Sequence, residues 1–179
     1  MQLQTQQPET THAERCSTLV LGLGNILLRD EGVGVHVVRA LAEVGLPADV
    51  EVFDGGTAGI DLLDVLADRH RVIVIDALDC DGPPGTVLRL EPGDLLPAAG
   101  QAVSLHEMGL LETLAVARVL GIAPRDLVIL GVKPHDVKWG LDLSPKIKRL
   151  LPRIVELVLT ELNVQSDAQC LCAEGQEQP

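Results

Sequence analysis

Apolar positions along the chain form short, almost continuous runs of Val, Ile and Leu. Such runs are typical of strands that a parallel sheet buries on both faces. They lie at residues 17–22, 50–53, 71–76 and 127–132. Residues 86–90 alternate apolar and polar side chains instead, which predicts an edge strand. The sequence therefore predicts about five strands.

Between these runs, apolar residues recur every three or four positions, which is the spacing of one helix face. Each of these segments follows a residue that can cap a helix, namely Asp30, Thr57, Ser104 or Ser144. Glu107 stands three positions after Ser104, as in a capping box. We therefore expect a helix after each of these four residues.

Strands and helices alternate through the whole chain. This order predicts an α/β fold, a single domain with a twisted, mostly parallel sheet and helices on both faces. The length of 179 residues fits one domain. We expect residues 1–16 to be a disordered lead, residues 17–162 to form the α/β domain, and residues 163–179 to be a disordered polar tail.

The net charge of −12 restricts the possible partners. An acidic chain is repelled by nucleic-acid phosphates and by anionic membrane surfaces. No stretch approaches the ~18 apolar residues that a membrane span requires. Residues 1–14 are polar and lack the apolar segment of a signal peptide. We expect a cytoplasmic monomer that binds neither nucleic acid nor membrane.

Four cysteines are present, at Cys16, Cys80, Cys170 and Cys172. Their spacing matches no disulfide framework, which favours reduced thiols in a cytosolic protein. The pair Cys170 and Cys172 has the chemistry to bind a soft metal, but it lies in the polar tail. Its role stays open at this point.

Two carboxylates occupy positions where ligand sites form in α/β proteins, outside the carboxyl ends of strands. Asp76 ends an apolar strand, where an ionised carboxylate is costly unless it is paired or bound to a metal. Hydrogen bonds from loop amides would also explain it. Glu31 follows Asp30 at the start of a predicted helix, where the helix dipole alone would favour an acid.

His106 is the third candidate, in the first turn of a predicted helix. The positive helix end disfavours imidazolium, and a neutral imidazole can bind a metal. A histidine bonded to backbone is the alternative, and His135 is a secondary candidate. With Glu31 and Asp76, His106 would give the mixed oxygen and nitrogen ligands that suit Zn, Ni or a similar divalent ion. Three protein ligands leave positions open for water or substrate.

Two other kinds of site receive little support. Gly22 and Gly24 suggest a dinucleotide fingerprint, but the third glycine is replaced by Leu27. No serine lies in the G-x-S-x-G sequence of hydrolases, and nothing places a base beside Cys80. Nucleotide binding and Ser or Cys nucleophile chemistry are therefore disfavoured.

Four motifs, taken in their order along the chain, resemble those of the hydrogenase maturation endopeptidases. These enzymes trim the C-terminal extension from the large subunit of nickel–iron hydrogenases. The resemblance runs from about Thr18 to about Leu162, and four ordered motifs together are specific. The motifs are LGLGNILLRDEGVG at residues 21–34, DGGTAG at 54–59, IDA at 75–77 and SLHEMG at 104–109.

The resemblance implies that Glu31, Asp76 and His106 are the metal-binding residues. The metal would be nickel already installed in the substrate, the large-subunit precursor, although another divalent ion could occupy the same ligands. The resemblance further implies that the precursor is recognised by Asp54, Gly55, Gly56 and Thr57.

The expected activity is hydrolysis of a peptide bond beside the nickel of the precursor. The metal could polarise the carbonyl, activate a water or only position the substrate. Asp54 is a candidate general base, which gives the predicted catalytic set Glu31, Asp76, His106 and Asp54. The alternative function is a non-catalytic checkpoint or chaperone that binds the precursor without cutting it.

Overall fold

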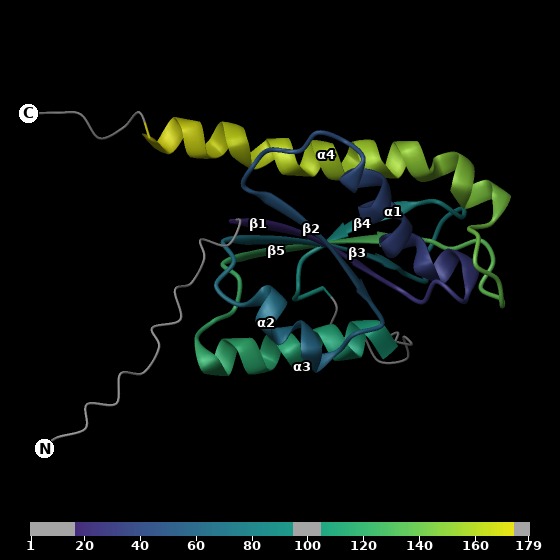
Figure 1. The fold of residues 1–179 in the computed structure, drawn as a ribbon, viewed down its shortest axis with the longest axis horizontal. Helices are drawn as coiled ribbons and strands as arrows, with labels where there is room; N and C mark the ends of the chain where they lie inside the picture. The colour runs from purple at the N-terminus through teal and green to yellow at the C-terminus, as the bar shows by residue number, and fades with distance from the viewer. Residues whose placement is uncertain (1–16, 95–104, 174–179) are drawn as a thin grey trace, which may run out of the picture.

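The computed structural model describes the backbone of residues 17–94 and 105–173, and the side chains of residues 17–94 and 109–163. The elements follow the predicted alternation along the chain (Figure 1). In order they are β1 (Thr18–Leu23), η1 (Arg29–Gly32), α1 (Val33–Ala42), β2 (Val50–Gly56), η2 (Ile60–Leu62), α2 (Leu63–Leu66), β3 (Arg71–Ala77), β4 (Val87–Leu90), α3 (Leu105–Leu120), β5 (Asp126–Val132) and α4 (Pro145–Ala173).

The described strands form one five-stranded sheet with the order β2-β1-β3-β5-β4. β1 pairs in parallel with both β2 and β3, β3 pairs in parallel with β5, and β4 is an antiparallel edge strand. From β1 the chain proceeds to β2 on one side and later to β3 on the other. The strand order therefore reverses between β1 and β3, which is where ligands bind in open α/β sheets. The predicted fold class is confirmed.

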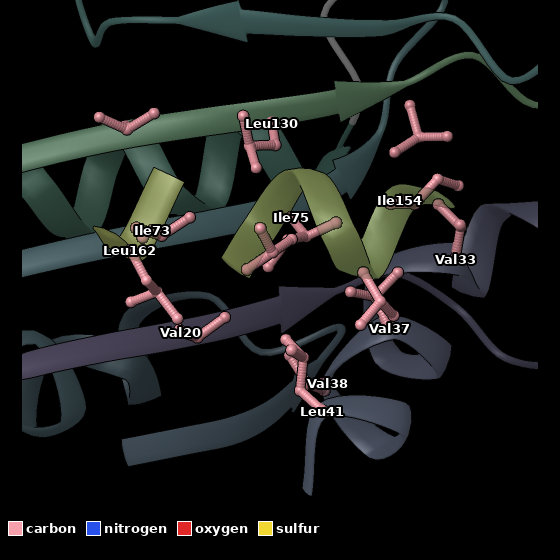
Figure 2. Packing of buried hydrophobic residues seen from close by; sticks show 14 of the residues in the cluster. Val20, Val33, Val37, Val38, Leu41, Ile73, Ile75, Leu130, Ile154 and Leu162 are labelled. Carbon is pink, nitrogen blue, oxygen red and sulfur yellow. The ribbon is translucent and has the colours of Figure 1, made fainter. Parts of the chain in front are cut away.

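Helices α1 and α4 cover one face of the sheet, and α2 and α3 cover the other (Figure 1). Successive side chains of a strand point to opposite faces, so each central strand supplies both cores. In β3, Ile73 and Ile75 belong to the core under α1 and α4, whereas Val72 and Val74 belong to the core over α2 and α3. Figure 2 shows part of the first core, to which α4 contributes Ile154.

The start of α1 is pressed against the sheet through two glycines. A Cβ at Gly34 would overlap the carbonyl oxygens of Ile75 and Leu23, and a Cβ at Gly22 would overlap the carbonyl oxygen of Gly34. Because neither glycine has a side chain, the helix backbone reaches the strands directly. This close approach fixes α1 over β1 and β3 at the point of strand-order reversal.

The helix starts only partly match the prediction. Asp30 does not cap α1, because the helix begins at Val33 with Gly32 as its N-cap. Thr57 does not cap the next helical segment either, since η2 has Gly59 as its N-cap. Ser144 is confirmed as a cap, because its hydroxyl accepts a hydrogen bond from the Ile147 amide at 3.3 Å.

The last helix is longer than the sequence predicted. α4 continues to Ala173, so the predicted beginning of a disordered tail at residue 163 falls inside it. No proline or glycine follows Pro152 within α4 to end it earlier. Cys170 and Cys172 lie in its last turns, and their side chains are outside the described part. Three further predictions also lie outside the described part of the chain: those for residues 1–16, for residues 174–179 and for the capping box at Ser104.

Within the ranges given above, no helix combines the length and the apolarity that a membrane span requires.

Candidate functional site

Asp76 lies near the carboxyl end of β3, and its side chain is buried. One carboxylate oxygen, Oδ1, accepts a hydrogen bond from the Ala77 amide at 2.8 Å. The pleat of the strand places Asp76 on the same face as Val72 and Val74, whose side chains pack in the core with α3. Asp76 is thus directed toward the layer that contains the helix of His106.

Glu31 lies in η1, directly after the loop that leaves β1. Gly24 has φ +128°, and a Cβ there would overlap the Glu31 carbonyl oxygen, so the backbone at Glu31 is packed against the end of β1. Side-chain atom Oε2 of Glu31 is buried and has no hydrogen-bond partner among the described residues. A buried carboxylate oxygen without a donor is costly, and a bound cation would remove that cost.

These two carboxylates flank the reversal of strand order. β1 and β3 are adjacent parallel strands, with Gly22 of β1 paired to Ile75 of β3. Glu31 follows the first strand, and Asp76 follows Ile75 in the second. The carboxyl ends of β1 and β3 therefore lie side by side, at the edge of the sheet where the sequence predicted the site.

The third predicted ligand, His106, lies in the first turn of α3, but its side chain is outside the described part. One turn later, a Cβ at Gly109 would lie 3.2 Å from the Cα of Gly59. The start of α3 thus contacts the segment that follows β2. Figure 1 shows this end of α3 on the side of the sheet where β1 and β3 end.

Convergence of the three predicted ligands therefore stays a prediction. Among the described side chains, which do not include His106, no group of three His, Cys, Asp or Glu residues could hold a metal ion. The donors present are the carboxylates of Glu31 in η1 and of Asp76 near the end of β3, and Oε2 of Glu31 is buried without a donor among the described residues. Oxygen donors of this kind fit a divalent cation.

Asp30 has a role that the sequence analysis did not predict. Its side chain is fully buried, and Oδ2 accepts hydrogen bonds from the amides of His135 at 3.0 Å and Asp136 at 2.9 Å. Oδ1 accepts a third from the Ser144 amide at 2.6 Å. The donors lie 105 to 114 residues further along, so no local pattern could have revealed them. Through these hydrogen bonds Asp30, the residue before Glu31, is held against the loop between β5 and α4.

Asp54 lies within β2, which extends to Gly56 rather than ending at residue 53. Its Oδ2 accepts two hydrogen bonds from the guanidinium of Arg39, at 2.9 and 3.2 Å. Its Oδ1 accepts a hydrogen bond from the Gly56 amide at 3.2 Å. Both carboxylate oxygens are therefore engaged, and Arg39 was not among the predicted site residues.

His36 of α1 differs from the surface residue that its helical position suggested. The ring is half-buried, and Nε2 is buried without a hydrogen-bond partner in the described part of the chain. Burial, followed by the charge of Arg39, lowers the pKa of His36, and a hydrogen bond with the Leu141 backbone opposes this shift. His135, the secondary candidate ligand, is exposed, and it contributes its backbone amide to Asp30.

Comparison with known proteins decides the family. The model of the hydrogenase maturation protease family matches residues 35–161. The chain belongs to this family. Hydrogenase 2 maturation protease of Escherichia coli is 38% identical over 146 residues, which cover 80% of this chain and 89% of that protein.

Solved structures of maturation proteases have the same fold. The hydrogenase maturating endopeptidase HybD from E. coli superposes with a TM-score of 0.74 at 36% identity, covering 83% of this chain and 93% of that one. The hydrogenase 2 maturation peptidase from a Thaumarchaeota archaeon gives 0.63 at 36% identity, covering 82% and 97%. The resemblance seen in the four motifs is confirmed, and the maturation protease is a peptide-bond hydrolase.

Proposed function

We propose that this maturation protease removes the C-terminal extension from the large-subunit precursor of a nickel–iron hydrogenase after nickel has been inserted. Family membership and the names of the relatives support the class of reaction. The observation that supports the site is the buried Oε2 of Glu31, which has no donor among the described residues. Glu31 follows β1, the strand that pairs with β3, which carries Asp76.

In this proposal the nickel arrives as part of the substrate. Glu31, Asp76 and His106 would contact the ion from three elements that meet at one edge of the sheet. Carboxylate and imidazole donors suit Ni²⁺, and three protein ligands leave positions for the donors of the precursor. Held in this way, the ion would polarise the scissile carbonyl, activate a water or hold the bond in place.

Asp54 is better suited to organising the recognition segment than to accepting a proton. A general base needs a free lone pair directed at the water, and hydrogen bonds from Arg39 and Gly56 already use about three of the four lone-pair sites of the Asp54 carboxylate. The Gly24 amide also donates to the Gly56 carbonyl at 2.8 Å, which ties this segment to the end of β1. We therefore propose that Asp54 and Arg39 fix Gly55, Gly56 and Thr57 for binding of the precursor.

The non-catalytic checkpoint is not favoured, because the relatives are proteases. The decisive experiment incubates the purified protein with nickel-loaded and nickel-free precursor and follows the mass of the large subunit. We expect loss of the C-terminal extension only from the nickel-loaded form. Stable binding without a change of mass would instead support the checkpoint.

The same assay tests His106. We expect His106→Ala to abolish processing, because the imidazole would be lost from the nickel contact. His135→Ala is the matched control, since that imidazole is exposed and only its backbone amide contacts Asp30. Unchanged processing by His106→Ala would remove His106 from the proposed site.

A further inference from the structure

Four exposed apolar side chains lie on the two loops beside Glu31. They are Leu27, Val137, Trp139 and Leu141, which we call the Trp139 surface. Trp139 is the only tryptophan of the chain and is 80% exposed, and the other three are 46% to 67% exposed. Large exposed apolar side chains that gather in one place are typical of interaction sites, and tryptophan is enriched at the centres of interfaces.

Backbone hydrogen bonds hold the two loops together. The Gly140 amide donates to the Leu27 carbonyl at 2.9 Å, and the Arg29 amide donates to the Gly140 carbonyl at 3.0 Å. The Arg29 guanidinium also pairs with Asp136 at 2.9 Å. Asp30 also accepts hydrogen bonds from the backbone of the second loop. The apolar side chains are therefore carried by a backbone that is held in place. Binding to such a prearranged surface costs less conformational entropy.

The segment that carries Val137, Trp139 and Leu141 is basic, whereas the chain as a whole is acidic. Residues 133–153 contain six of the 14 basic residues but only two of the 26 acidic ones. Lys138 and Lys148 are exposed, and their pairs with Asp136 and Asp142, at 3.2 and 4.0 Å, are of the weak surface kind. Two exposed basic side chains, Lys138 and Lys148, therefore lie on the segment that carries most of the apolar surface. This combination is complementary to an apolar segment flanked by acidic residues.

We propose that the Trp139 surface docks the folded part of the hydrogenase precursor, through an exposed apolar segment with acidic flanks. Leu27 lies four residues before Glu31, in the loop that leads into η1, so a protein bound here is adjacent to the proposed site. Docking would position the precursor while its C-terminal end reaches Glu31 and Asp76. This inference rests on the proposed function and adds a partner surface to it.

Steady-state kinetics with nickel-loaded precursor test the surface. Trp139→Ala is expected to raise KM about tenfold or more and to leave kcat unchanged, because only binding is lost. Val137→Ala is expected to raise KM severalfold. Its matched control is Val119→Ala, which removes the same two methyl groups from the 87% exposed Val119 near the end of α3. An unchanged KM in Trp139→Ala, or an equal increase in Val119→Ala, would overturn the proposal.

The single tryptophan allows a test that does not depend on cleavage. Incorporation of 5-fluorotryptophan gives one ¹⁹F signal, which is expected to shift when unlabelled nickel-loaded precursor is added. A shift without loss of the extension would support docking while refuting the proposed proteolysis. Cleavage without a shift would refute docking alone. A shift that grows with protein concentration in the absence of precursor would show self-association and would also overturn the proposal.

The contribution of charge to docking can be measured separately from that of the apolar side chains. Lys148→Glu is expected to raise KM severalfold at low ionic strength, and this difference should shrink as salt is added. Glu43→Lys, an exposed change of opposite sign at the end of α1, serves as the control. An effect of Lys148→Glu that is independent of salt would contradict an electrostatic contribution to docking.

Discussion

The carboxylate of Asp30 accepts a hydrogen bond of 2.6 Å from the backbone amide of Ser144, 114 residues further along the chain. Two more amides, of His135 and Asp136, donate to the same side chain. One buried residue thus connects the β1–α1 region to the loop between β5 and α4, up to the residue that caps α4. The position of Glu31, its neighbour in sequence, depends on this connection.

Replacing Asp30 should therefore destabilise the whole domain. Asp30→Ala leaves three amides without their acceptor, and hydrogen bonds to charged groups contribute about 1.5–3 kcal/mol each. We expect the free energy of unfolding to fall by about 3 kcal/mol or more, measured by urea denaturation. Asp142→Ala, at an exposed position, should change it by less than about 0.5 kcal/mol. Equal stability of the two variants would contradict the assigned role of Asp30.

Gly34→Ala should destabilise the protein although alanine is the better helix former. The added Cβ would overlap the carbonyl oxygens of Ile75 and Leu23, so α1 would have to move off the sheet. We expect a loss of about 1–3 kcal/mol, as for other overpacked cores. Thermal unfolding measures it against Gly45→Ala, where a Cβ meets nothing within 4 Å. A Gly34→Ala protein as stable as wild type would show that the helix does not lie this close.

Glu161 of α4 should be more important for stability than its neighbour Glu156. Glu161 binds the buried Arg71 at 2.6 Å and Arg89 at 3.1 Å, whereas Glu156 pairs with the exposed Arg153. Glu161→Gln leaves a buried guanidinium with less compensating charge, so we expect a loss of about 2–3 kcal/mol. Glu156→Gln should cost less than about 1 kcal/mol. Urea denaturation of both variants distinguishes these values, and similar losses would contradict the prediction.

His36 should make stability depend on pH. Its pKa is lowered in the folded protein by burial and by Arg39, so the unfolded chain binds the proton more readily. This contribution is complete above the unfolded pKa of about 6.5 and is lost as pH falls below it toward the folded pKa. The urea midpoint of wild type should drop between pH 7.5 and pH 5.5. In His36→Gln the drop should be smaller, and in His135→Gln, at an exposed ring, it should remain.

Glu31→Gln should separate function from stability. The substitution keeps the size of the side chain but removes the charge of an oxygen that has no donor among the described residues. We expect processing of nickel-loaded precursor to fall about 100-fold or more, which corresponds to about 3 kcal/mol of lost transition-state stabilisation. The free energy of unfolding should change by less than about 1 kcal/mol. Glu43→Gln, the same change at an exposed position, should affect neither quantity, and normal processing by Glu31→Gln would exclude Glu31 from the site.

The sequence predicted the strands well because a strand buried on both faces must be apolar along its whole length. The runs at Leu19 and Ile73 belong to strands whose alternate residues fill both cores, so they appear as continuous apolar segments. Ser144 was predicted correctly for a related reason, since a cap depends on residues only a few positions away. Glu31 and Asp76 could be placed at one sheet edge because the carboxyl ends of parallel strands lie together.

What local spacing alone could not decide was which distant groups meet. Asp30 and Thr57 have the chemistry of helix caps, yet the tertiary structure gives Asp30 three amides that lie 105 to 114 residues further along the chain. The pairing of Asp54 with Arg39 and the two loops that present Trp139 are of the same kind. The sequence by itself determined the order of elements, the family and the edge of the sheet at which the site is proposed, because these follow from short-range pattern. Only the packed structure determined the partners of each polar side chain, because those partners are brought together by burial of the sheet and not by their spacing in the chain.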